Sequence, residues 1–126
     1  MMWKTLMIDD VGQLALTALE DLKGQQVVTL DVTELSDVMD TLIIATGTSN
    51  RHVKSLASNV VEELKKQGHQ PIGVEGMDCA DWVLVDYGTS VVHVMLPQTR
   101  QFYDLEKLWT PLERNNELSS DDPSAQ

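Results

Sequence analysis

Apolar residues recur at two different spacings along the chain, and the spacing distinguishes predicted helices from predicted strands. Between 9 and 22 they return every three or four positions, as on one face of an α-helix. The same spacing runs from 53 onwards and stops at Gly68, a typical residue just beyond a helix end. A third helix is predicted to start near Pro97 and to carry Phe102, Leu105, Leu108 and Trp109.

Runs rich in β-branched residues predict the strands. They lie at 26–32, 41–46, 81–87 and 90–96, with a short strand or extended loop, interrupted by glycines, at 70–76. The run TLIIAT at 41–46 is apolar on both faces, which is typical of a strand at the centre of a sheet.

The order of these elements, α-β-β-α-β-β-β-α, predicts an α/β fold with a mixed β-sheet packed by helices. Strand 41–46, the second helix and the following strand should form a right-handed βαβ unit. Strands 81–87 and 90–96 are joined by Gly88-Thr89, a two-residue loop with glycine first, as a type II′ hairpin prefers.

Length and composition indicate one domain. Of the 126 residues, 1–112 are predicted to form it, whereas 113–126 are acidic, poor in large apolar side chains and expected to be disordered. Cys79 is the only cysteine, which excludes an internal disulfide and fits a reducing, cytoplasmic location. No apolar run reaches the roughly 20 residues that cross a bilayer, and the N-terminus does not resemble a signal peptide. We therefore expect no membrane association.

Charge limits the choice of partner. Twenty acidic residues against nine Lys and Arg give a net charge of −11, so phosphate backbones repel the chain and direct DNA binding is disfavoured. A basic protein partner is favoured instead, because opposite potentials speed encounter. The alternative is that the charge serves only solubility.

The stretch GTSNRH at 47–52 lies between a predicted strand and a predicted helix. Gly47, Thr48 and Ser49 could bind an anion with backbone N–H groups at the start of the helix. Alternatively, Thr48, Ser49 or Asn50 caps that helix. The stretch lacks the spacing of a P-loop or of a dinucleotide-binding turn, so capping is the favoured interpretation.

Arg51 and His52 then fall in the first helical turn, where the helix dipole disfavours cations. We expect an acidic group to hold them, either Asp37 or Asp40 or a group from a partner.

The residue pattern contains no catalytic set, and we predict no metal site and no cofactor. Nucleotidyl transfer would need closely spaced carboxylates for magnesium, but no D-x-D occurs. None of the three histidines has a carboxylate or cysteine at ligand spacing. No nucleophile motif is present.

The predicted hairpin carries more apolar surface than one core needs. Alternation places Val83, Val85, Val92 and Val94 on one face. The other face carries Trp82, Leu84, Asp86, Val91, His93 and Met95. Either a helix covers this second face, or it binds a protein through an apolar, tryptophan-centred patch with an acidic rim. The rim would consist of Glu75, Asp78, Asp81 and Asp86.

Several blocks in order, GTSNRH, VEG, DWVLVDYG, VVHVM and FYDLEKLW, show that the sequence resembles the Iojap family of ribosomal silencing factors (RsfS) from about residue 8 to Trp109. The resemblance implies a nucleotidyltransferase-like fold without the catalytic carboxylates, and therefore no enzyme. It implies binding to the large ribosomal subunit through its protein fourteen, which blocks joining of the small subunit and lowers translation when nutrients are short. It also implies a homodimer when the protein is free.

The partner-binding residues carried over to this sequence, with their hairpin neighbours, are Glu75, Asp81, Trp82, Leu84, Asp86, Tyr87, Val91 and His93. Under this interpretation, the turn with Gly47, Thr48, Ser49, Arg51 and His52 is mainly structural. Two other functions stay open: a late ribosome assembly factor, as organelle relatives are, and a nucleotide-binding module.

Overall fold

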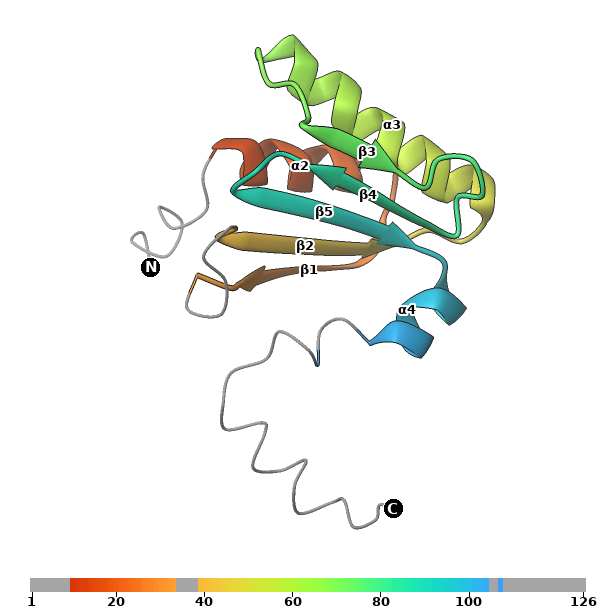
Figure 1. The fold of residues 1–126 in the computed structure, drawn as a ribbon. Helices are drawn as coiled ribbons and strands as arrows, with labels where there is room; N and C mark the ends of the chain where they lie inside the picture. Colours follow the sequence, from red (N-terminus) through yellow and green to blue (C-terminus); the bar gives the residue numbers. More distant parts are fainter. Residues whose placement is uncertain (1–9, 34–38, 105–106, 108–126) are drawn as a thin grey trace, which may run out of the picture.

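A computed structural model describes residues 10–33, 39–104 and 107 (Figure 1). The described part confirms the predicted order of helices and strands. They are α2 (Asp10–Asp21), β1 (Gln25–Asp31), β2 (Thr41–Thr46), α3 (Asn50–Lys66), β3 (Gly73–Glu75), β4 (Trp82–Asp86), β5 (Ser90–Met95) and α4 (Pro97–Tyr103). The predicted disordered tail at 113–126 lies outside the described residues.

The five strands form one mixed sheet in the order β1-β2-β5-β4-β3. β2 and β5 are parallel, and every other neighbouring pair is antiparallel. β2 and β3 therefore run in the same direction, as the predicted crossover through α3 requires. However, β5 and β4 lie between them, an arrangement that the sequence pattern does not predict.

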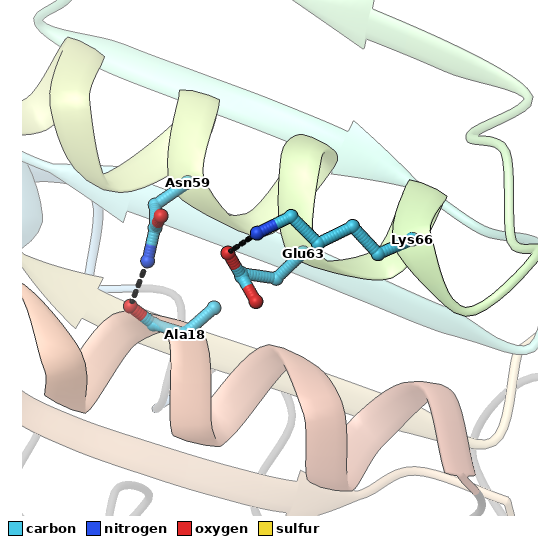
Figure 2. Close-up of polar contacts among 4 residues, drawn as sticks. All are labelled: Ala18, Asn59, Glu63 and Lys66. Atoms are coloured by element: carbon cyan, nitrogen blue, oxygen red, sulfur yellow. Dashed lines mark hydrogen bonds and ion pairs between the residues drawn. The ribbon is translucent and has the colours of Figure 1, made fainter.

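Both long helices pack on the same face of the sheet (Figure 1). The apolar stripe of α3, from Val53 to Leu64, is buried against α2 and the strands. Between the helices, the Asn59 side-chain amide donates to the backbone carbonyl of Ala18 at 2.9 Å (Figure 2). The Lys66–Glu63 ion pair on the same helix is exposed (Figure 2), so apolar burial is the main source of stability on this face.

The β4–β5 hairpin has the predicted register. Val85 faces Val92, Leu84 faces His93, and the Tyr87 N–H donates to the Ser90 carbonyl. Gly88 adopts a φ of 91°, which the first residue of a type II′ turn requires.

The end of the third helix differs from the prediction. α4 stops at Tyr103 because Asp104 takes a left-handed conformation, with φ 51°, and its N–H donates to the Arg100 carbonyl. One continuous helix that reaches Trp109 is therefore wrong. Leu105, Leu108 and Trp109 lie outside the described residues.

Candidate functional site

The outward side chains of the hairpin lie on the face of the sheet opposite α2 and α3, which we call the second face. They belong to an apolar cluster separate from the helix-covered core. Its buried members are Val32, Leu42, Ile44, Val91 and Met95, with Trp82 and Leu84 partly buried against them. Neither α2 nor α3 covers this face. These two helices therefore do not support the alternative that a helix covers the second face of the hairpin.

Trp82 is held in place by His93. The indole Nε1–H donates to His93 Nδ1 at 2.8 Å, and the ring centroids are 5.8 Å apart. His93 is only 8% exposed, and burial lowers its pKa to about 4. The ring is therefore neutral at pH 7 and can accept the indole proton. This bond satisfies the polar atom of Trp82 and leaves part of the ring accessible.

Two of the four predicted rim residues, Glu75 and Asp86, lie on the second face, whereas Asp78 lies with Arg51 and Lys54 in a separate hollow at the start of α3. Glu75 is exposed on β3 and lies opposite Leu84. Asp81 is exposed just before β4, and its carboxylate accepts from the Asn50 side chain at 2.8 Å. Asp86 is partly buried, and its carboxylate accepts from the Gly88 N–H at 2.7 Å within the hairpin turn. Asp86 therefore has a structural role in addition to its charge.

Three of the predicted partner-binding residues are placed less favourably for contact. Tyr87 packs against the helix-covered core rather than the second face. Its hydroxyl is buried without a hydrogen-bond partner in the described part of the chain, and burial raises its pKa to about 12. Val91 and His93 are on the second face but buried. The accessible part of the predicted site thus consists of Glu75, Asp81, Trp82, Leu84 and Asp86.

Sequence reasoning missed two aromatic residues of α4, one of which contacts Trp82. The Tyr103 ring centroid lies 4.7 Å from that of Trp82, and Phe102 packs edge-on against Tyr103 at 5.0 Å. Phe102 is 79% exposed and Tyr103 50% exposed. The neighbouring pair FY gave no sequence signal of this exposure, because adjacent helical residues point only about 100° apart and can share one core, as Leu56 and Ala57 do on α3.

The GTSNRH stretch is a capped strand-to-helix turn. Ser49 is the N-cap of α3, and its hydroxyl accepts from the His52 N–H at 3.1 Å. The N–H groups of Gly47 and Thr48 are also taken, by the Met95 carbonyl and by His52 Nδ1. Capping by Ser49 is confirmed. The engaged N–H groups leave fewer donors for an anion.

His52 is held by backbone groups rather than by an acid. Its Nδ1 accepts from the Thr48 N–H at 2.9 Å, and its Nε2 lies 2.8 Å from the Leu22 carbonyl. This pair of contacts fits a neutral ring with the proton on Nε2. Bracing by Asp40 is wrong, because Asp40 precedes β2 whereas the turn follows it. Asp37 lies outside the described residues.

Residues 10–33, 39–104 and 107 contain no group of three or more His, Cys, Asp or Glu side chains that could hold a metal ion. No helix in the same residues is long and apolar enough to span a membrane. Arg51, Lys54 and Asp78 line a separate hollow beside Cys79.

Comparison with known proteins identifies the family. Residues 7–126 match the family described as "Ribosomal silencing factor during starvation". The ribosomal silencing factor RsfS of Chromobacterium violaceum is 48% identical over 102 residues, which cover 81% of this chain and 84% of that protein. The chain belongs to the RsfS family.

Other RsfS-family relatives extend the comparison. RsfS of Haemophilus influenzae is 43% identical over 77% of this chain and 95% of that protein. A mouse protein named "Mitochondrial assembly of ribosomal large subunit protein 1" is 43% identical over 74 residues, 56% of this chain and 32% of that protein.

Solved structures agree with the fold described above. A crystal structure from Chromobacterium violaceum has a TM-score of 0.79 and 47% identity, covering 82% of this chain and 89% of that one. One from Bacillus halodurans has a TM-score of 0.71 and 39% identity, covering 77% and 90%. The mixed sheet and its helices are thus shared with these proteins.

Proposed function

We propose that this chain is a translational repressor that binds the large ribosomal subunit through its protein fourteen. Bound there, it would sterically block joining of the small subunit and lower translation under nutrient limitation. It would act in the cytoplasm and would need no chemical reaction, because occupying the partner's surface is enough.

The observation that carries this proposal is membership of a family of ribosomal silencing factors. The second face supplies physical support. Trp82 is partly exposed and fixed by His93, and tryptophan is among the residues that dominate binding energy at interfaces. The net charge of −11 and the exposed Glu75 carboxylate beside Leu84 suit a basic protein better than RNA.

Co-sedimentation with isolated large subunits, followed by addition of small subunits, tests the proposal. We expect stoichiometric binding and loss of the joined ribosome. Binding that leaves subunit joining unchanged would contradict the anti-association role, and absence of binding would contradict the proposal altogether.

Trp82→Ala tests whether the second face makes the contact. Removing a central tryptophan should weaken large-subunit binding by about 2 kcal/mol or more. Val74→Ala is the matched control, because Val74 is a partly exposed apolar residue opposite Val85, on the helix-covered side of the sheet. Unchanged affinity in a folded Trp82→Ala variant would remove the second face from the site.

A late role in assembly of the large subunit is the second candidate function, favoured by the name of the mouse relative. Deleting the gene and profiling ribosomal particles distinguishes these two candidate functions. If the chain is an assembly factor, immature large subunits should accumulate during growth. If it is a repressor, the large subunits should be mature and should join small subunits to excess on starvation.

We also propose that the free protein is a homodimer, as the family resemblance implies. Light scattering over a dilution series should show a mass that falls towards that of the 14.1 kDa chain. A monomer at every concentration would remove this part of the proposal.

A further inference from the structure

Helix α4 presents two exposed aromatic side chains, Phe102 and Tyr103, and the Tyr103 ring contacts Trp82. Phe102 and Tyr103, which we call the aromatic pair, are more exposed than any other large apolar residues of the described chain except Ile72. Single exposed apolar residues need no explanation, but a contiguous patch typically marks an interaction surface. Through the ring contact between Tyr103 and Trp82, the aromatic pair is continuous with the second face.

The structure fixes the aromatic pair in position before any partner arrives. Arg100, one turn earlier, is buried, and its Nη1 donates to the Gln26 carbonyl at 2.6 Å and to the Thr46 hydroxyl at 2.8 Å. These bonds attach a seven-residue helix to β1 and β2. The left-handed Asp104 then ends the helix directly after Tyr103. A preorganised aromatic surface loses little conformational entropy on binding.

We propose that Phe102 and Tyr103 form the second half of the contact with the basic large-subunit protein, receiving a lysine or arginine side chain on their ring faces. This inference rests on the proposed function and extends its site beyond the hairpin. A cation over an aromatic face is attracted by the ring quadrupole. Asp104 follows Tyr103, and its carboxylate lies 3.6 Å from the Lys107 ammonium, so a cationic side chain is already accommodated at this end of α4. Exposed ring faces on a chain with a net charge of −11 fit the chemistry of a cationic protein side chain.

Phe102→Ala is the primary test, because its ring is the most exposed and the ring contact it makes is with Tyr103. Affinity is measured for whole large subunits and for their isolated protein fourteen. We expect Phe102→Ala to bind both about tenfold more weakly. Ile72→Ala is the matched control, since Ile72 is 74% exposed and lies next to the edge strand β3. It should bind as the unchanged chain does.

Two conservative variants test the role of the ring face. Phe102→Tyr keeps an aromatic face and should retain affinity. Phe102→Leu keeps apolar surface but has no ring quadrupole. It should therefore lose most of the binding affinity that Phe102→Ala loses. Equal affinity of the Leu and Tyr variants would overturn the cation–ring contact.

The outcomes separate this inference from the proposed function. If Phe102→Ala binds normally while Trp82→Ala does not, the aromatic pair is outside the interface and the inference fails alone. If Phe102→Ala weakens binding to whole subunits but not to the isolated protein, the rings contact RNA or another protein, which also overturns it. If the unchanged chain binds no large subunits, the proposed function itself fails.

Discussion

At the residue scale, the Trp82–His93 pair combines a hydrogen bond with a buried titratable ring. Burial lowers the pKa of His93 from 6.5 to about 4. Between these values the unfolded chain binds a proton that the folded chain does not, so this stability is fully present above pH 6.5, decreases as the pH falls from 6.5 to 4, and changes no further below 4. Protonation would also turn Nδ1 into a donor and break its bond with the Trp82 indole.

We therefore predict that lowering the pH from 7 to 5 costs about 2 kcal/mol of unfolding free energy through His93. Urea unfolding at both pH values measures it. His93→Asn is the control, because the amide oxygen can still accept from the indole but does not titrate. The variant should lose correspondingly less stability over the same pH interval. Equal losses in both proteins would assign the pH dependence to other groups.

At the scale of elements, the loop between β3 and β4 determines where Asp81 and Trp82 lie. The Asn50 side chain at the start of α3 contacts the carbonyls of Cys79 and Ala80, and the Ala80 N–H donates to the Gly76 carbonyl. Gly76 has a φ of 91°, and a Cβ there would collide with the backbone carbonyl oxygen of Trp82. That oxygen cannot move without moving β4.

Gly76→Ala should therefore destabilise the fold by about 3 kcal/mol, from left-handed strain together with the backbone collision. Two other glycines separate these causes. Gly68 has a positive φ but open space around it, so its alanine variant should cost about 1 kcal/mol. Gly73 has open space and no positive φ, so its variant should stay within about 1 kcal/mol of the unchanged chain. Thermal or urea unfolding of the three variants checks this order of destabilisation. A Gly76→Ala variant as stable as Gly73→Ala would contradict it.

The sequence predicted those elements that depend on local chemistry. The hairpin register followed from Gly88-Thr89, because turn geometry fixes which residues face each other. Burial of 41–46 followed from its unbroken apolar run, and every residue of β2 is indeed buried. In contrast, the placement of β5 and β4 between β2 and β3 depends on pairing between distant segments, which no local pattern encodes.

The candidate site was predictable to a similar extent. Alternation placed Trp82, Leu84 and His93 on one face, whereas the family resemblance added Tyr87, which points to the opposite side. The aromatic pair was missed because the apolar residues after Pro97 suggested one continuous stripe. The left-handed conformation of Asp104 ends that helix, and aspartate in this conformation is too uncommon to predict from sequence.

At the scale of the whole molecule, the net charge of −11 should act mainly on the rate of association. Attraction between opposite potentials speeds encounter and is screened by salt, whereas apolar contact around Trp82 controls dissociation. We predict that raising the salt concentration from about 0.05 to 0.5 M slows association with the isolated protein fourteen by about tenfold. The dissociation rate should change much less. Stopped-flow anisotropy with a labelled partner measures both rates.

A charge-matched pair of variants distinguishes the acidic border of the second face from the total charge. Glu75→Gln and Glu20→Gln each remove one negative charge, but Glu75 adjoins Leu84 on the second face whereas Glu20 is exposed on α2. Because attraction is strongest for charges that approach the partner within the screening length, Glu75→Gln should slow association more than Glu20→Gln. Equal slowing would mean that total charge attracts the partner. Faster association on removing either charge would contradict a basic partner, because an acidic surface attracts only an opposite potential.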